Sequence, residues 1–188
     1  LMASHSSCRA IANMPRNLTD DQIKRLAAKG GLVMINFGSI FLEQNTWNAF
    51  IDQKKRIAPD YEKLKVQYEK DPHGLSRELH SLFDKQPPLP RATLARVADH
   101  IEHVIKVGGA DAVGLGTDFD GIDDPPTGLG DYAMLPRLSA ELLRRGHSEA
   151  EVRKVLGENF LAFLGRVEAV RDALAKQNEP PATSVYAN

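Results

Sequence analysis

The sequence predicts an α/β fold in which short parallel strands alternate with helices. Residues 32–37 and 112–116 are apolar runs of strand length, as expected for strands that are buried on both faces of a parallel sheet. Residues 1–3 resemble the end of a further strand, and a helix of about ten residues separates them from residues 32–37. A strand–helix–strand unit of this size implies parallel pairing with a right-handed crossover.

The first helix is predicted from its end signals. Thr19 is an N-cap residue, and Gln22 three positions later completes a capping box. Leu18 and Ile23 occupy the two positions of a hydrophobic staple. The pair Gly30-Gly31 ends the helix before the next strand.

Residues 45–90 interrupt this alternation with a polar, Lys/Glu-rich helical segment. The expected helices are residues 47–57, 61–70 and 75–83, and Pro59 and Pro72 are expected to separate them. Acidic residues nearly match the basic ones, so the run Lys54-Lys55-Arg56 indicates a solvated helix face rather than a basic patch. We expect this insertion to cover the mouth of a site or to form an oligomer contact.

The alternation resumes after residue 90. We expect a helix over residues 91–107, the strand over 112–116 and a loop rich in Asp, Pro and Gly over 120–130. A further helix closes at Gly146. Ser148 and Glu151 form a second capping box that opens a final amphipathic helix reaching Val167.

Composition excludes several classes of protein. The chain has 188 residues, of which 42% are hydrophobic and 26% charged, with a net charge of −1. These values fit one globular domain over residues 1–176, followed by a flexible tail over 177–188. The balanced charge gives no case for binding nucleic acid or an anionic membrane surface, and no apolar run approaches the roughly 18 residues of a transmembrane segment. The single cysteine, Cys8, excludes an intrachain disulfide and leaves the cellular compartment open.

The strand at residues 112–116 is followed at once by Asp118, Asp120 and Gly121. In parallel sheets the carboxyl edge carries the site, because the loops that follow the strands build it. Asp118 is therefore the first candidate for a functional carboxylate, and Asp120 is the second. The structural alternative is a turn or helix-capping aspartate, since Asp-Gly is a common turn signal.

His5 and Arg16 follow the first strand fragment and are expected at the same sheet edge. A histidine there is suited to bind a metal ion through its neutral imidazole. An arginine there is suited to hold a substrate carboxylate with two parallel hydrogen bonds. The alternatives are a hydrogen-bonded histidine without a ligand and a surface arginine.

Three further residues are weak candidates for metal binding or catalysis. His100 and His103 lie three positions apart on the helix over 91–107, but its apolar face points inward, so we expect both on an outer polar face. Cys8 is a weak candidate nucleophile, because no histidine stands at a recognisable spacing to act as its base.

Several ordered motifs resemble a known family. They are Ser4-His5-Ser6-Ser7, Pro15-Arg16-Asn17, Val33-Met34-Ile35-Asn36-Phe37, Asp99-His100-Ile101-Glu102-His103, Gly114-Leu115-Gly116-Thr117-Asp118-Phe119-Asp120-Gly121 and Gly157-Glu158-Asn159-Phe160. Together they resemble the carboxyl-terminal half of the zinc-dependent membrane (renal-type) dipeptidases, peptidase family M19. The segment over residues 45–90 resembles the bacterial members more than the animal ones.

The resemblance implies a (β/α)8 TIM-like barrel, of which this chain would supply the last three strands and their helices. It also implies a dipeptide substrate, two zinc ions in the complete enzyme, and a homodimer. His5 matches a histidine ligand of the second zinc ion. Arg16 matches the arginine that binds the terminal carboxylate of the substrate. Asp118 matches the aspartate that contacts the amino end of the substrate and accepts a proton.

In such a site, two zinc ions share a hydroxide that attacks the peptide carbonyl. The family's His-x-Asp pair, its bridging glutamate, its other zinc-binding histidine and a further catalytic histidine belong to earlier strands and have no match here. Because zinc takes about four ligands, we expect this chain to be a carboxyl-terminal fragment that is inactive alone. The alternatives are a degenerate, non-catalytic barrel or binding protein, and a related amidohydrolase that acts on other small amides.

Overall fold

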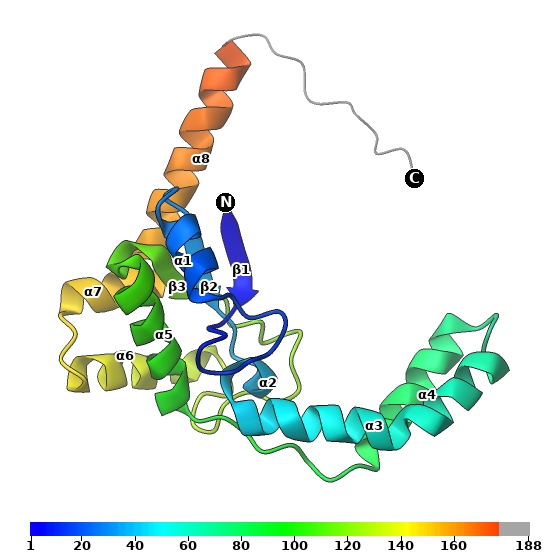
Figure 1. Cartoon of the computed structure of the whole chain (residues 1–188). Helices are drawn as coiled ribbons and strands as arrows, with labels where there is room; N and C mark the ends of the chain where they lie inside the picture. Colours follow the sequence, from blue (N-terminus) through cyan, green and yellow to red (C-terminus); the bar gives the residue numbers. More distant parts are fainter. Residues whose placement is uncertain (177–188) are drawn as a thin grey trace.

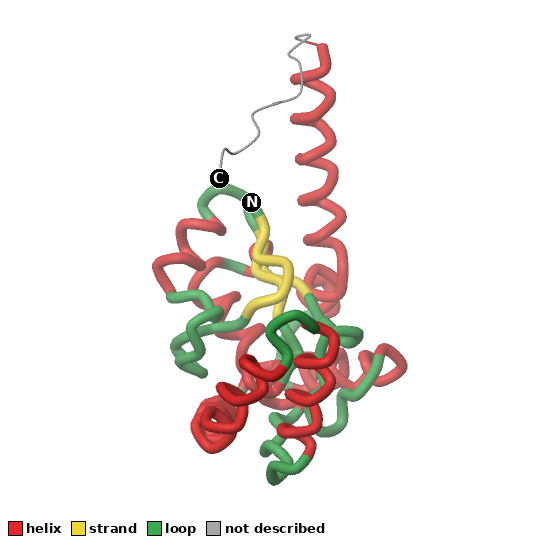
Figure 2. Tube along the Cα trace, turned by 90° about the vertical axis from the view of Figure 1, so that its right-hand side faces the viewer, coloured by secondary structure: helices red, strands yellow, loops and turns green. Residues whose placement is uncertain are grey.

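The computed structural model describes residues 1–176 and has the predicted α/β architecture, with helices arranged around a small parallel sheet (Figure 1). The strands are β1 Met2–Ser6, β2 Leu32–Ile35 and β3 Val113–Leu115, and they lie in the order β1-β2-β3. Both neighbouring pairs are parallel, which confirms the predicted pairing. Figure 2 shows the three strands at the centre of the molecule with the helices around them.

The helices are α1 Asp20–Ala27, α2 Ser39–Leu42, α3 Gln44–Gln67, α4 Pro72–Asp84, α5 Leu94–Gly108, α6 Leu135–Arg144, α7 Glu149–Arg153 and α8 Asn159–Lys176. Helices α1 and α5 contact each other and β2. Their apolar faces bury Ile23 and Leu26 from α1, and Val97, Ile101 and Val104 from α5. The sheet and these two helices therefore enclose the main hydrophobic core.

Both predicted capping boxes are confirmed. The side chain of Thr19 accepts a hydrogen bond from the Gln22 backbone N–H, and Gln22 Oε1 accepts one from the Thr19 N–H at 2.9 Å. Ser148 and Glu151 make the same reciprocal pair at the start of α7. These interactions satisfy backbone N–H groups that the first helical turn leaves unpaired.

The first strand is longer than predicted and changes the place of His5. Strand β1 continues past Ala3 to Ser6, so His5 lies within the strand rather than after it. Ala3 pairs with Val33 and Ser6 with Ile35, which leaves one extra residue on β1 between the two pairs. A bulge of this kind redirects side chains, and here it carries Ser4 and His5.

The expectation that His100 faces outward is wrong. His100 on α5 is fully buried, and its Nδ1 accepts a hydrogen bond from the Cys8 N–H at 3.0 Å. Its Nε2 donates to the Leu42 carbonyl, also at 3.0 Å. The loop after β1 and helix α2 close over this side of α5, and the imidazole pairs one backbone group from each. His103 is half-buried, with its Nε2 2.7 Å from Asp20 Oδ1.

The predicted break at Pro59 is also wrong, because α3 continues through Pro59 as one helix. Pro59 and Lys55, the residue whose carbonyl loses its intrahelical partner, are both exposed, so water can bond that carbonyl. Helix α4 begins at Pro72, where a missing N–H costs nothing, and the Asp71 side chain accepts from the Gly74 N–H at 2.9 Å. Together α3 and α4 form a hairpin that projects from the sheet and its helices (Figure 1). Its origin as an insertion over residues 45–90 stays a prediction.

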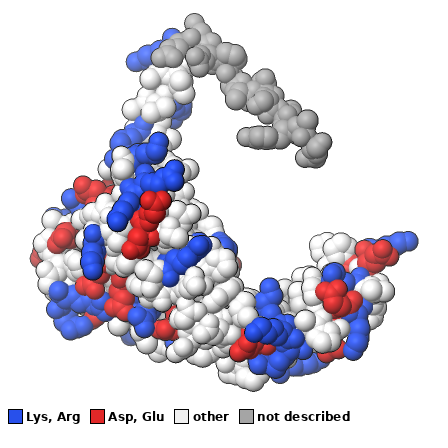
Figure 3. Space-filling model, in the orientation of Figure 1, with Lys and Arg blue, Asp and Glu red and all other residues white. Residues whose placement is uncertain are grey.

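Charges of both signs are mixed over the hairpin surface (Figure 3). Ion pairs one helical turn apart join Lys55 to Asp52 at 3.1 Å and Lys63 to Asp60 at 2.9 Å. Such exposed pairs contribute about 0.3–0.5 kcal/mol each. The hairpin therefore presents no continuous basic surface on this face.

The carboxyl-terminal helix is not the single helix that was expected. A π-helical turn, Lys154–Glu158, separates α7 from α8. Directly after it, Asn159 Nδ2 donates to the carbonyls of Ala110 and Val113, which fixes the start of α8 against β3. Apolar side chains along α8, a helix predicted to be amphipathic, are exposed, with Leu164 at 40% and Val167 at 47%. Among residues 1–176, no segment packs over this face.

No helix within residues 1–176 has the length and apolarity needed to cross a lipid bilayer. The predicted flexible tail, residues 177–188, lies outside the described residues.

The burial of His100 predicts a pH-dependent stability. Burial lowers the pKa of His100 from 6.5 to about 4. The unfolded chain therefore binds a proton at His100 below about pH 6.5, whereas the folded chain binds it only at about pH 4. The contribution of this group to the free energy of unfolding is fully present above about pH 6.5 and decreases as the pH falls through this interval. The expected loss is about 3 kcal/mol, and urea unfolding followed by circular dichroism measures it. His100→Gln cannot titrate and should lose less stability over the same interval; an equal loss would contradict the assignment.

Candidate active site

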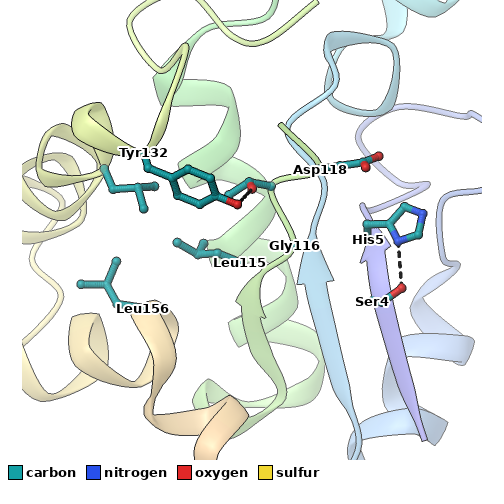
Figure 4. A pocket seen from close by; sticks show the side chains of 9 residues that line it. Ser4, His5, Leu115, Gly116, Asp118, Tyr132 and Leu156 are labelled. Atoms are coloured by element: carbon teal, nitrogen blue, oxygen red, sulfur yellow. Dashed lines mark hydrogen bonds between the residues drawn. The ribbon is translucent and has the colours of Figure 1, made fainter. Parts of the chain in front are cut away.

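The carboxyl ends of the three strands bring polar side chains to one edge of the sheet. His5 lies near the end of β1, Asn36 follows β2 and Asp118 follows β3. Figure 4 shows His5 near the end of β1 and Asp118 beyond the end of β3, with β2 lying between these two strands. A cavity of about 390 Å³ is lined by both residues. The structure thus brings together two of the candidates that the sequence placed at this edge, His5 and Asp118.

The backbone of Asp118 has an unusual conformation. Its φ of 59° makes it the one non-glycine residue with positive φ among residues 1–176. This left-handed conformation costs an ordinary side chain energy and recurs at functional sites. The Asp118 carbonyl accepts a hydrogen bond from the Gly121 N–H at 2.8 Å, which closes the turn. Asp120 is exposed and lines neither this cavity nor the groove described below.

Asn36 holds the Asp118 carboxylate and was given no role by the sequence. Asn36 is fully buried; its Nδ2 donates to Asp118 Oδ2 at 3.0 Å, and its Oδ1 accepts from the Gly38 N–H at 2.6 Å. The available signal was an amide at the end of an otherwise apolar strand, where burial requires a hydrogen-bonding partner. Asn36 therefore fixes the orientation of the Asp118 carboxylate through its Oδ2 atom.

Gly121 lies directly against the carboxylate of Asp118. A Cβ atom at Gly121 would lie 2.5 Å from Asp118 Oδ1, closer than real side chains approach. Only glycine leaves room for the carboxylate in its present position.

His5 keeps one ring nitrogen available. Its Nδ1 lies 2.8 Å from the Ser4 hydroxyl, and the imidazole is exposed to the cavity (Figure 4). When Nδ1–H donates to Ser4, the Nε2 lone pair is free to bind a ligand. On the far side of the cavity, the Tyr132 hydroxyl accepts from Thr117 Oγ1 at 3.1 Å. Tyr132 also packs edge-on against Phe119, with the ring centroids 4.9 Å apart, a contribution that the sequence did not predict.

The described residues do not form a metal site by themselves. Among residues 1–176, no group of three or more His, Cys, Asp or Glu side chains is arranged to hold a metal ion. His5 is a suitable donor, but one imidazole supplies one of the about four ligands that zinc takes.

Arg16 lies at a second hollow, next to the first. Its backbone carbonyl accepts from Ser6 Oγ at 2.8 Å, and its guanidinium carbon lies 4.8 Å from the centroid of the buried Phe41 ring. The guanidinium is exposed to a groove of about 690 Å³, which Asp118 also lines. Asp118 thus borders both the cavity of His5 and the groove of Arg16.

Cys8 is excluded as a nucleophile. It is fully buried in the core, and burial, followed by the charge of Asp20, raises the pKa of its thiol to about 12. A thiol with so high a pKa supplies almost no thiolate at neutral pH. Neither Cys8, His100 nor His103 lines the two hollows.

Comparison with known proteins identifies the family. The profile of "Membrane dipeptidase (Peptidase family M19)" matches residues 1–178. The chain belongs to this family. The resemblance drawn from the sequence motifs is therefore confirmed.

Relatives within the family are moderately similar. An uncharacterized dipeptidase of Schizosaccharomyces pombe is 31% identical over 178 residues, which are 94% of this chain and 33% of that protein. Dipeptidase verJ of Clonostachys rogersoniana is 30% identical over 183 residues, 97% of this chain and 36% of that protein. The chain thus spans about one third of the length of these relatives.

Solved structures of the family share the fold. The dipeptidase AC, a metallopeptidase of family M19, superposes with a TM-score of 0.62 at 28% identity, over 88% of this chain and 37% of that chain. A metallopeptidase from Rhodobacter sphaeroides, liganded with a phosphinate mimic of the dipeptide L-Ala-D-Ala, gives the same TM-score and identity over 88% of this chain and 36% of that chain.

The close packing of Gly121 against Asp118 predicts what a methyl group added at Gly121 does to the carboxylate. Gly121→Ala should displace the carboxylate and break its hydrogen bond to Asn36, because the added Cβ occupies the space beside Oδ1. We expect a stability loss of about 1 kcal/mol, the usual net value of one hydrogen bond, because the carboxylate at the end of its side chain can move away. Crystal structures of the variant and of Gly130→Ala check this. Gly130 lies in the same loop with nothing within 4 Å of its Cβ position, so that variant should leave Asp118 in place. An unmoved carboxylate in Gly121→Ala would overturn the packing argument.

Proposed function

We propose that this chain provides the substrate-positioning side of a zinc-dependent dipeptidase. Membership of the family supports the reaction class. The observation that carries the proposal is the place of Asp118, which borders the cavity of His5 on one side and the groove of Arg16 on the other. A carboxylate next to a guanidinium provides complementary charges for a small molecule with a free amino group and a free carboxylate.

Arg16 is proposed to bind the terminal carboxylate of the dipeptide. Its guanidinium has no carboxylate partner within residues 1–176, and Phe41 beneath it supports the planar group. Two parallel N–H donors fit a carboxylate, so binding would fix both the position and the direction of the peptide. The Rhodobacter sphaeroides relative was solved with a mimic of a dipeptide, a ligand of the same class.

Asp118 is proposed to bind the amino end of the dipeptide and to accept a proton during hydrolysis. Asn36 occupies Oδ2, so Oδ1 is the oxygen available to the substrate. An ammonium group beside this carboxylate would hold the peptide at the end opposite to Arg16. A carboxylate in this place is also suited to carry a proton towards the departing amine.

His5 is proposed as one zinc ligand in a site of two zinc ions. The free Nε2 and the exposure of the ring to the cavity support this role. The three strands are proposed to be the last strands of a (β/α)8 barrel, since their parallel order and their strand ends suit that architecture. We further propose that residues 1–176 form one domain and that the enzyme is a homodimer, as the family resemblance implies.

The role of Arg16 is tested with a substrate that lacks the carboxylate. In the enzyme as its gene encodes it, Arg16→Gln should lower kcat/KM for Ala-Ala by about 100-fold or more, because a charged, bidentate contact is lost. With Ala-Ala amide, which offers no carboxylate, wild type and variant should hydrolyse equally slowly. A variant that loses the same factor on both substrates would show that Arg16 does not bind the carboxylate. Preference for the amide would favour an amidohydrolase of another kind.

The roles of Asp118 and His5 are separated by zinc analysis. Asp118→Asn should lower kcat by orders of magnitude while zinc content stays unchanged, because the amide keeps the shape of the side chain but cannot accept the proton. His5→Ala should remove about one zinc ion per chain. Turnover and metal content, measured on the same preparations, check both statements. Near-normal turnover of Asp118→Asn would refute its catalytic role, and unchanged zinc in His5→Ala would refute the ligand assignment.

A further inference from the structure

The groove that begins at Arg16 and Asp118 extends to the α3–α4 hairpin. It is also lined by Phe50 of α3 and Phe83 of α4, two residues more than 30 positions apart in the chain. Its volume of about 690 Å³ falls within the about 300–1,000 Å³ typical of small-molecule sites. The groove therefore joins Arg16 and Asp118 to an aromatic pair, and its lining also includes polar side chains, among them His80, Asp84 and Arg91.

The aromatic pair presents a defined apolar surface. The rings of Phe50 and Phe83 stack with centroids 6.0 Å apart and planes 12° apart, and both side chains are half-buried. Trp47 lies against Phe50, with its centroid 5.9 Å away. The partly exposed rings gain free energy when an apolar group covers them. Leu89 and Ile122 extend the apolar lining.

One wall of the groove is fixed to α3 by buried polar side chains. Gln53 is almost fully buried, and its Nε2 donates to the Pro87 carbonyl. Thr46 is fully buried, and its Oγ1 donates to the Pro90 carbonyl at 2.7 Å. The proline-rich stretch between these two carbonyls has restricted backbone freedom of its own. This wall is therefore rigid before any ligand arrives.

Another wall is fixed to α2 through Asp124, which also lines the groove. Its carbonyl accepts a hydrogen bond from the Ser39 N–H at 3.1 Å, and its Oδ2 accepts one from the Ile40 N–H at 3.1 Å. Partial burial raises the pKa of this carboxyl, and the Ile40 N–H opposes that rise. Ile122, two residues earlier, and Ile40 also line the groove. A groove with two fixed walls loses little entropy on binding.

We propose that this groove receives the side chain of the carboxyl-terminal residue of the substrate and selects large aromatic or aliphatic side chains there. The inference rests on the proposed function, in which Arg16 holds the terminal carboxylate. The carbon that bears this carboxylate also bears the side chain, so the side chain starts within a few ångströms of Arg16. The hollow that opens from Arg16 leads to Phe50 and Phe83.

Four dipeptides test the inference in the enzyme as its gene encodes it. Wild type should have a higher kcat/KM for Ala-Phe than for Ala-Gly, and a smaller difference between Phe-Ala and Gly-Ala. In the double variant Phe50→Ala/Phe83→Ala, the ratio for Ala-Phe over Ala-Gly should fall by about 10- to 100-fold. The ratio for Phe-Ala over Gly-Ala should not change. Val66→Ala is the matched control, because Val66 is an apolar residue of α3 that is 81% exposed and lies outside the groove.

A second variant fills the groove instead of widening it. Leu89→Trp should lower kcat/KM for Ala-Phe much more than for Ala-Gly, and it keeps both phenylalanines. Circular dichroism and gel filtration of each variant report folding and oligomeric state.

The outcomes separate the inference from the proposed function. If wild type hydrolyses none of the four dipeptides, the proposed function fails, and the inference fails with it. If hydrolysis occurs but the Ala-Phe preference is absent, or survives in both variants, only the inference fails. If the variants change the oligomeric state and leave the preference intact, the groove binds a second copy of the chain rather than the substrate.

Discussion

The imidazole of His100 lies between two connections of the fold and pairs with a backbone group of each. It accepts a hydrogen bond from the N–H of Cys8, after β1, and donates one to the carbonyl of Leu42, after β2. His100 itself belongs to α5, the helix that leads to β3. One buried side chain therefore links the segments around all three strands. Leaving either backbone group unpaired would cost about 1–3 kcal/mol, so the strand ends keep a fixed relation to one another.

At this fixed carboxyl edge of the sheet, the candidate site contains one residue, Asp118, with an unfavourable backbone conformation. Asp118 has positive φ; its carboxylate is oriented by Asn36, which directly follows β2, and has room because Gly121 carries no side chain. The cost of the conformation is offset by these local contacts. Asn36 directly follows β2 and Asp118 follows β3, so the sheet itself helps to fix the orientation of the carboxylate. Such preorganisation suits a group that must meet a small, charged molecule.

The sequence predicted the features that depend on short stretches of chain. The capping boxes at Thr19 and Ser148 need only two residues three positions apart, and the parallel strands follow from apolar runs joined by a helix. The sequence also placed Asp118 and His5 at one sheet edge, and the structure brings them to one cavity. Their chemical roles stay predictions.

Other features depend on contacts between distant segments, which periodicity does not report. His100 lies on the apparent polar side of α5 but is covered by segments 58 and 92 residues away. The π-helical turn after α7 forms where Asn159 reaches two carbonyls of the chain before and within β3. Asn36 acquires a role only because residue 118 lies beside it. The groove between Arg16 and the hairpin likewise needs side chains from several elements.

The projecting hairpin formed by α3 and α4 has a consequence for how such an enzyme diversifies. It supplies no strand and no residue of the main core cluster, so its inner surface can accumulate substitutions with little effect on the sheet. The strand ends that hold His5, Asn36 and Asp118 are separate from it in the chain. Under the proposed function, mutations in the hairpin are expected to alter which dipeptides are accepted, whereas mutations at the strand ends are expected to alter the reaction. Natural selection can act on the two independently within one gene.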